Sequence, residues 1–417
     1  MDLVQEVLNC IDGCLLPKLS RNLEECDNHP EFQLWEKNLA LYHSKLNDYL
    51  NDLDFCKYSD NSAVISSLLI LYHELGSDGV WQSEKAKHCC KVTKIQFETM
   101  YNISLEKLLT YENNNICNTQ EVFDKIMELI HKQLTHNDFK KYPALIAVYH
   151  NIILNLKEYE VIHKPTSLLP LSLLLIDDFI NENKIKGLQC CSSILSNLTQ
   201  DNFHGGNYYE VIYGVLKKNI TEKDLDVVTL VLDCLLNLFK IMPSGVKVTT
   251  MDNTFDLILG QLYTETNLYK KKSLFSFVNK LIPLHGVHCV KRRMFLIVIC
   301  DNLDICSNVS VAEILLREVV ESLENWTRYN WCIWRLQSNF KILLVLIKIL
   351  YVHCEDEKIS TRLQNILMTL IKLRSVEEQK QIFNNLKSKM HVKVFKECFV
   401  KKLAMIMNNL NDNIEIN

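Results

Sequence analysis

Two adjacent aspartates, Asp177 and Asp178, follow an apolar run at residues 168–176. Paired carboxylates could hold a metal ion or exchange a proton, as they do in many catalytic sites. Carboxylates between two helices have a commoner role, because they accept hydrogen bonds from the free N–H groups of the next helix and meet its positive dipole end. We therefore predict that both residues close one helix and cap the next, with catalysis as the alternative.

The chain holds 16 cysteines and 13 histidines, and their spacing bears on metal binding. Structural zinc sites usually use paired ligands roughly two to four residues apart. No C-x-x-C occurs, and the nearest groupings are adjacent residues at 88–90, 190–191 and 288–289. Neighbours on a helix point about 100° apart and rarely share one ion. We predict no metal site and, because no secretory signal opens the chain, reduced thiols buried in the core.

Motifs typical of catalysis are missing from the sequence. It contains no G-x-S-x-G elbow, no phosphate-binding loop and no H-E-x-x-H pair, the patterns that position nucleophiles, phosphates and catalytic zinc. We predict no catalytic residue, no cofactor and no small-molecule substrate. A cysteine–histidine dyad built from distant positions stays open, since its spacing carries no signal.

Aromatic and basic residues concentrate between residues 324 and 340, where three of the chain's five tryptophans occur. Tryptophan, tyrosine and arginine are enriched at binding hot spots, because each offers a large contact area with a polar end. This segment is the predicted partner-binding surface, unless its rings pack between helices. The candidate residues are Trp326, Arg328, Tyr329, Trp331, Trp334 and Arg335.

Basic residues cluster at 270–272, 291–293 and 401–402 in a chain whose formal net charge is −4. Nucleic-acid binding needs positive charge gathered on one face, and this chain as a whole is slightly acidic. We predict no direct nucleic-acid partner. The clusters are either the solvated sides of helices or a docking patch for an acidic protein.

Glycine and proline are scarce, at 10 and 7 in 417 residues, where average usage would give roughly 29 and 21. Sheet proteins and nucleotide-binding folds use both residues heavily, so the composition predicts an all-α chain. The longest apolar run, at residues 340–354, is interrupted by Lys341 and Lys348 and is too short to span a membrane. The chain exceeds the length of a single compact core, so it must form several domains or an array of repeats.

From about residue 119 onward, apolar residues recur three and four positions apart, the spacing of one buried helical face. At residues 225–239 the apolar positions are Leu225, Val228, Val231, Leu232, Leu235, Leu236 and Phe239. Short polar breaks separate such segments, and units of about 40 residues recur, as in stacked helical hairpins. We predict an α-solenoid of stacked antiparallel helix pairs of the HEAT/ARM type.

Residues 168–198 show this repeat pattern in detail. A proline near the start of the first helix costs little, the aspartates form the turn, and small residues in the second helix allow a close approach. The predicted packing motif is Pro170, Ile185, Gly187, Leu188 and Cys190. Along the whole chain we predict a divergent N-terminal helical region at 1–118, HEAT-like repeats at 119–411, and a short disordered tail at 412–417.

The order of residues in LLPLSLLLIDDFINENKIKGLQC (168–190) also resembles the Telo-two-interacting protein two family, the smallest subunit of the Triple-T (TTT) complex. In that family a proline-and-leucine helix, an Ile/Leu-Asp-Asp, a polar turn with Glu-Asn-Lys and a Gly-Leu-x-Cys helix follow in this order. The matching positions are Pro170, Ile176, Asp177, Asp178, Glu182, Asn183, Lys184, Gly187, Leu188 and Cys190.

The resemblance implies a solenoid without catalytic activity that acts as a co-chaperone adaptor. Its partners would be the two larger subunits, Telo-two and Telo-two-interacting protein one. Indirect partners would be the ninety-kilodalton heat-shock chaperone (Hsp90), the R2TP machinery and the phosphatidylinositol-three-kinase-related kinases that they mature. Those kinases serve DNA-damage signalling, growth control and telomere maintenance, so the expected location is cytoplasmic and nuclear. The alternatives are an importin-like cargo-binding solenoid and an all-α enzyme without a recognisable motif.

Overall fold

The computed structural model of the chain describes residues 3–23, 29–52, 61–110, 116–203, 206–336, 341–389 and 395–416. Within these ranges the regular structure is α-helix with short 3-10 turns, and they contain no β-strand. None of the helices in these ranges is long and apolar enough to cross a lipid bilayer. The chain is an all-α solenoid, as its composition and periodicity predict.

Contacts divide the chain into two compact units, residues 1–215 and 216–417, and the division falls within α9 (Tyr208–Asn219). The helices of the first unit are α1 (Leu3–Cys14), α2 (Pro30–Asp52), α3 (Asn61–Gly76), α4 (Glu84–Tyr101), α5 (Thr119–Gln133), α6 (Pro143–Leu154), α7 (Pro165–Ile176) and α8 (Asn181–Asn197). Those of the second unit are α10 (Leu225–Ile241), α11 (Ser244–Thr264), α12 (Leu268–His285), α13 (Met294–Ile305), α14 (Val309–Leu336), α15 (Lys341–Val352), α16 (Glu357–Lys372), α17 (Val376–Lys389) and α18 (Glu397–Ile416).

Helix α10 shows why these segments become helices. Asp224 precedes it, and its carboxylate accepts hydrogen bonds from two N–H groups of the first turn at 3.0 and 3.1 Å. Asn118, Asn267 and Asp356 cap α5, α12 and α16 in the same way, which satisfies N–H groups that lack a partner within the helix. The predicted apolar stripe of α10 is confirmed from Val228 onward. Its buried members are Val228, Val231, Leu232, Leu235, Leu236 and Phe239.

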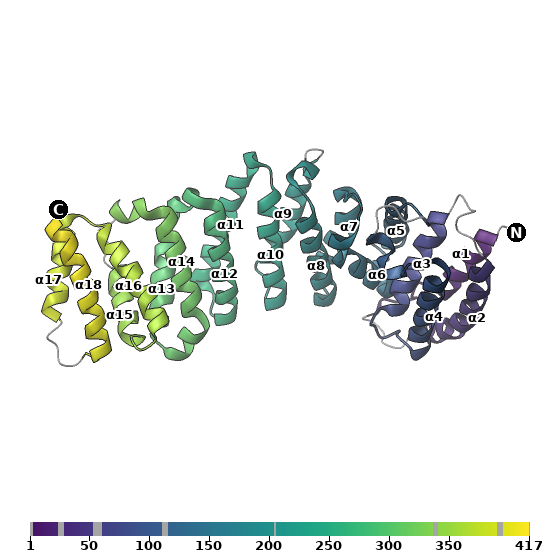
Figure 1. Ribbon diagram of the computed structural model, residues 1–417, viewed down its shortest axis with the longest axis horizontal. Helices are drawn as coiled ribbons and strands as arrows, with labels where there is room; N and C mark the ends of the chain where they lie inside the picture. Colours follow the sequence, from purple (N-terminus) through teal and green to yellow (C-terminus); the bar gives the residue numbers. More distant parts are fainter. Residues whose placement is uncertain are drawn as a thin grey trace. The chain divides into compact units, whose positions relative to one another are not determined.

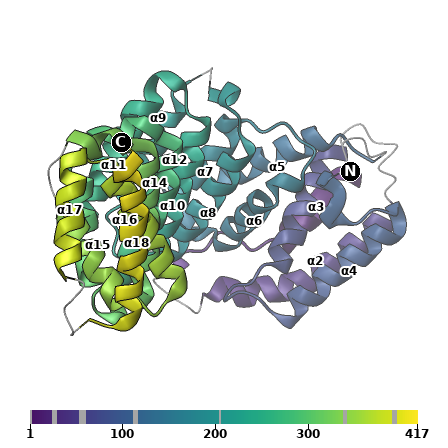
Figure 2. The ribbon, with the colours of Figure 1, turned by 60° about the vertical axis from the view of Figure 1, so that its left-hand side comes forward.

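Within each unit, successive helix pairs stack on one another. In the second unit α10, α12, α14, α16 and α18 pack in chain order, and α11, α13 and α15 form a second row beside them (Figure 1). Figure 2 shows the last two pairs, α15–α16 and α17–α18, from a second direction. In the first unit α1, α3, α5 and α7 pack in the same alternating way. Each pair thereby covers the apolar side of its neighbour.

Salt bridges between neighbouring repeats recur at a spacing close to the predicted repeat length. Examples are Arg362–Glu324, Lys341–Asp301, Lys396–Glu355, Lys348–Asp304 and Lys402–Glu357. The partners lie between 38 and 45 residues apart in the sequence. This spacing confirms the repeat of about 40 residues. The pairs formed by Lys341, Lys348 and Lys396 are exposed, and such pairs contribute about 1 kcal/mol or less each to stability.

Groups on both sides of residue 118 bind each other. Ser62 donates to Glu121 at 2.8 Å, and the N–H of Leu19 donates to the carbonyl of Lys141 at 3.0 Å. The N-terminal region and the repeats are therefore in contact, and the boundary at 118 stays a prediction. Helix α18 continues to Ile416, and the short disordered tail at 412–417 also stays a prediction. Residue 417 lies outside the described residues.

Candidate functional site

The two aspartates between α7 and α8 have different environments. Asp177 is exposed, and its N–H donates to the carbonyls of Leu173 and Leu175 as α7 ends. The N-cap position of α8 is Ile180, and no side chain caps this helix. The prediction that both carboxylates cap α8 is therefore wrong, because the turn places the cap position two residues beyond Asp178.

The carboxylate of Asp178 is almost fully buried and makes three polar contacts. One oxygen lies 2.7 Å from the ammonium of Lys140 and accepts a hydrogen bond from the N–H of Ile180 at 3.4 Å. The other oxygen accepts a hydrogen bond from the side-chain amide of Asn183 at 2.8 Å. The Lys140 ammonium also lies 3.6 Å from the centre of the Phe179 ring. Lys140 precedes α6 and Asp178 follows α7, so this ion pair links two successive repeats.

The predicted packing motif lies between α7 and α8. Leu188 and Cys190 are fully buried, and Ile185 is half-buried. A Cβ atom at Gly187 would lie 2.7 Å from the backbone nitrogen of Ile176. Real side chains do not tolerate such a distance to backbone, so glycine is the residue that fits here.

Pro170 occupies a different place from the predicted one. Helix α7 begins at Pro165, which takes the first-turn position where a missing N–H is harmless. Pro170 lies inside the helix and is exposed. A proline there removes the hydrogen bond to the carbonyl four residues earlier, that of Thr166, which is also exposed. Solvent can therefore satisfy the freed carbonyl, and the helix continues.

The aromatic segment of α14 lies partly in the core. Trp326 is 1% exposed and stacks on Phe295, with ring centres 4.3 Å apart and planes tilted by 25°. Phe255 completes the cluster, 6.4 Å from the tryptophan ring. A partner cannot reach a ring held this way, so the predicted partner-binding role does not hold for Trp326. Farther along, α14 kinks at the fully buried Asn330, whose φ and ψ are −127° and 29°.

The remaining members of the aromatic segment lie around this kink. Arg328 is exposed, Tyr329 is half-buried, and Trp331 is 48% exposed. These three side chains remain candidates for contact with a partner. Trp334 and Arg335 belong to α14, but their side chains lie outside the described residues.

Four of the eight residues in the basic clusters form ion pairs. The pairs are Lys270–Glu265 at 3.3 Å, and Arg292–Asp252, Arg292–Asp256, Lys401–Glu397 and Lys402–Glu357 at 2.7 Å each. Neighbouring acids therefore neutralise much of this positive charge. Of the two interpretations of these clusters, the structure favours the polar sides of helices.

A groove of about 410 Å³ opens between α15, α17 and the start of α18. Helices α11, α13 and α15 pack in a row, and α17 packs against α16 and α18. The groove lies between α15 and α17. Its lining residues are Leu343, Leu344, Ile347, Gln381, Ile382, Asn385, Leu386, Phe395, Phe399 and Leu403.

The lining of this groove is apolar apart from two amides, those of Gln381 and Asn385. Leu344 stands at its rim with 67% of its surface exposed. Phe399 is buried in the floor, where the edge of its ring meets Tyr351 with centres 5.2 Å apart. Residues four apart on each helix supply the wall, so the groove presents apolar stripes parallel to three helices. Such a surface suits the apolar face of another helix.

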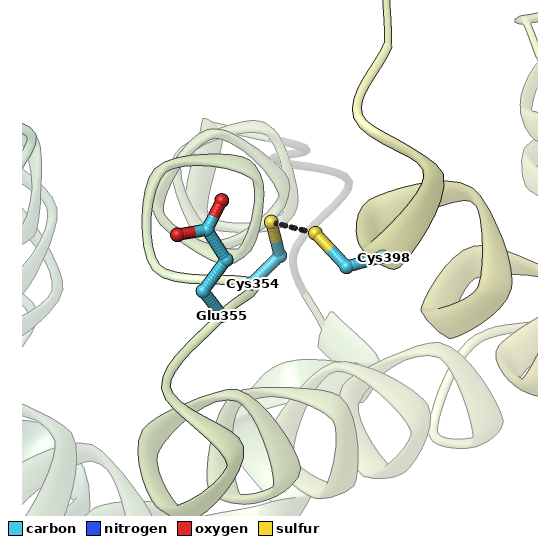
Figure 3. A group of neighbouring side chains, drawn as sticks. All are labelled: Cys354, Glu355 and Cys398. Atoms are coloured by element: carbon cyan, nitrogen blue, oxygen red, sulfur yellow. Dashed lines mark hydrogen bonds between the residues drawn. The ribbon is translucent and has the colours of Figure 1, made fainter.

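Beside this groove, Cys354, Glu355 and Cys398 bring potential metal-binding atoms within 4.8 Å of one another (Figure 3). The two sulfurs face each other at 2.6 Å. Burial of Cys354, followed by its contact with the Cys398 thiol, raises the pKa of Cys354. Glu355 pairs with Lys396 at 3.0 Å. Residue spacing gives no signal for this group, because the two cysteines lie 44 residues apart.

No family model matches the chain, but individual proteins do. TELO2-interacting protein 2 of Rattus norvegicus is 24% identical over 264 residues, which are 60% of this chain and 50% of that protein. TELO2-interacting protein 2 of Homo sapiens is 27% identical over 168 residues, 37% of this chain and 33% of that protein. Over these stretches the chain is similar to TELO2-interacting protein 2 of rat and human. The alignments span half or less of the length of these relatives.

Two solved structures are similar in fold to this chain. Kap121p bound to Ste12p matches 100% of this chain and 38% of its own, with a TM-score of 0.54 and 10% identity. Kap121p bound to Nup53p matches 99% of this chain and 37% of its own, with a TM-score of 0.52 and 10% identity. At these identities the likeness concerns the fold alone, and it confirms the HEAT-type solenoid.

Proposed function

We propose that this chain is a non-catalytic adaptor subunit that binds a TELO2-type protein and a partner of the Telo-two-interacting protein one type. The complex supports maturation of phosphatidylinositol-three-kinase-related kinases together with Hsp90 and R2TP, in the cytoplasm and nucleus. DNA-damage signalling, growth control and telomere maintenance are the processes it would serve. The observation that carries the proposal is the similarity to curated proteins whose name states an interaction with TELO2.

The local chemistry supports an adaptor over an enzyme. Asp178 was one of the two candidate catalytic acids. Its carboxylate forms an ion pair with Lys140 and accepts two hydrogen bonds, inside a contact between two repeats. The groove beside α15 is lined by hydrocarbon side chains and two amides, none of which exchanges protons at ordinary pH. A surface of this kind binds by removing apolar area from water.

We assign the groove to the partner and name the apolar face of a helix from the TELO2-type subunit as its occupant. The similarity to proteins named for an interaction with TELO2 suggests a protein partner, and the apolar groove supplies an open place for one. Leu344 is exposed at the rim, in the position where an incoming helix would bury it. Apolar anchors in a desolvated groove carry much of the affinity in helix-in-groove complexes.

The test is co-purification of the tagged full chain with the TELO2 homologue and the Telo-two-interacting protein one homologue of the same organism. Wild type should form a stoichiometric complex in gel filtration. Leu344→Asp should weaken it at least about tenfold, because a carboxylate would be buried in the groove. Val211→Asp is the matched control: it changes another exposed aliphatic residue of a helix, α9, and should leave the affinity unchanged.

The two parts of the proposal fail in different ways. A chain that purifies without either homologue, while remaining folded by circular dichroism, contradicts the adaptor function. A complex that forms normally with Leu344→Asp leaves the adaptor function standing and removes the groove as its docking surface. Equal losses of partner affinity for Leu344→Asp and Val211→Asp would also exclude the groove as the docking surface. The loss would then come from the added charge and not from its position in the groove.

A further inference from the structure

The sulfurs of Cys354 and Cys398 are close enough to become bonded to each other. They lie 2.6 Å apart, and a disulfide bond holds two sulfurs at about 2.05 Å. Closing that gap needs a movement of only about half an ångström. The cysteines come from different elements, since Cys354 follows α15 and Cys398 lies in the first turn of α18 (Figure 3).

A shared metal fits the same group less well. Two thiolates on a tetrahedral zinc lie about 3.8 Å apart, because each zinc–sulfur bond is about 2.3 Å long. The present pair would have to separate by more than an ångström to reach that distance. The third potential ligand, Glu355, is already paired with Lys396 at 3.0 Å. The geometry therefore favours a bond between the sulfurs.

The two thiols have unequal access to solvent. Cys354 is 1% exposed, whereas Cys398 is half-buried and can be reached by a small oxidant. Because an oxidant reaches Cys398 more easily, Cys398 is placed to react first, and Cys354 is placed to attack the product.

We propose that Cys354 and Cys398 form a reversible redox pair, which hydrogen peroxide or a related peroxide converts to an intrachain disulfide. The Cys398 thiolate attacks the O–O bond, forms a sulfenic acid and releases hydroxide, which takes up a proton to become water. The Cys354 sulfur then attacks the Cys398 sulfur, the S–O bond breaks, and the hydroxyl leaves with the thiol proton as a second water. Two thiols lose two electrons and two protons, and thiol exchange with a reductant reverses the bond.

The bond ties the first turn of α18 to the end of α15. Phe399 follows Cys398 directly and forms part of the groove floor against Tyr351. Oxidation therefore holds the groove at the width seen here. It also closes a loop that contains α16 and α17, which restricts the unfolded chain and raises the melting temperature. Neither effect depends on what binds in the groove.

The experiment uses the reduced full chain in metal-free buffer. It is treated with excess hydrogen peroxide, alkylated and digested without reductant, and the peptides are analysed by mass spectrometry. We expect a peptide linking Cys354 to Cys398, loss of these two thiols to alkylation, and return of both after dithiothreitol. The oxidised chain should melt several degrees higher than the reduced chain. Cys332→Ser changes an exposed cysteine and should keep the link, whereas Cys398→Ser should abolish it.

Two results would overturn the proposal. In the first, Cys354 and Cys398 are fully alkylated after peroxide although Cys332 has been oxidised, which shows that the oxidant was active. In the second, the reduced chain retains one equivalent of zinc that protects both thiols from peroxide and is lost in Cys398→Ser, which assigns the pair to a metal. The first result comes from wild-type protein alone, so it does not depend on the folding of a variant.

Discussion

Gly187 of α8 lies so close to Ile176 of α7 that a Cβ atom on the glycine would come within 2.7 Å of the isoleucine's backbone nitrogen. The carbonyl oxygen of Ser172 would lie 2.8 Å from the same atom. Both neighbours belong to the backbone, so no change of side-chain rotamer could relieve the clash. The two helices must move apart before any larger residue fits.

Gly187→Ala should therefore destabilise the chain by about 1–3 kcal/mol, the usual cost of forcing extra volume into a packed interface. The measurement is the urea midpoint of the full-length protein. Gly214→Ala is the matched control, because a Cβ atom at Gly214 in α9 meets nothing within 4 Å. That change should stabilise the helix by about 0.5–1 kcal/mol. A midpoint for Gly187→Ala at or above the wild-type value would contradict the close approach of α7 and α8.

The acidic doublet offers a comparison between adjacent residues of the same type. Asp178→Asn should cost about 1–3 kcal/mol, because it removes the counter-charge of the partly exposed Lys140 ammonium. Asp177→Asn should change stability by no more than about 0.5 kcal/mol, since that carboxylate is exposed. Chemical denaturation of the two variants measures the difference. Similar values for both would show that the Lys140–Asp178 pair adds no specific stability.

Glu74 should make the stability of the chain depend on pH. Burial raises the pKa of this carboxyl from 4.5 to about 8, although the N–H of Leu16 donates a hydrogen bond to it and opposes the shift. The folded chain then binds a proton more tightly than the unfolded chain, so stability is full below about pH 4.5 and is lost as the pH rises toward 8. The loss at pH 7 reaches up to about 3 kcal/mol.

Glu74→Gln tests this dependence, because the amide keeps the acceptor oxygen for Leu16 and cannot ionise. Unfolding free energies at pH 5, 7 and 9 should fall less steeply for the variant, which should exceed the wild type above about pH 6. Asp12→Asn gives a comparison in the same cavity. Burial also raises the pKa of Asp12, so removing this carboxyl should flatten the pH dependence of stability in the same direction. Parallel pH profiles for wild type and Glu74→Gln would contradict the buried, neutral state of Glu74.

Truncation should destabilise the chain far more at Trp326 than at Trp331, although both tryptophans belong to α14. Trp326→Ala should cost about 3–5 kcal/mol, because it empties the stack against Phe295. Trp331→Ala should cost roughly 1 kcal/mol or less, because about half of that ring is already in water. Thermal melts give the first comparison, and partner affinity gives the second. A large loss of affinity with unchanged stability in Trp331→Ala would place that ring in an interface.

Much of the fold follows from local patterns that the sequence displays. The stripe from Val228 to Phe239 predicts α10, because helix periodicity depends on residues within a few positions of one another. The repeat of about 40 residues is readable for the same reason. The aspartate doublet indicates a turn, but its partner does not follow from spacing: Lys140 lies on another repeat, and Ile180 takes the cap.

The candidate site required the packed chain. The Cys354–Cys398 pair and the groove floor at Phe399 join residues from separate hairpins, whose meeting depends on how each pair of helices stacks on the last. Trp326 and Trp331 have the same chemistry and lie five positions apart, yet only three-dimensional packing buries one and exposes the other. The sequence determined the helices, because helix formation depends on residues that are close together in the chain. Only the tertiary structure decided which side chains are buried and which distant residues touch, because burial and such contacts arise when helices pack against one another.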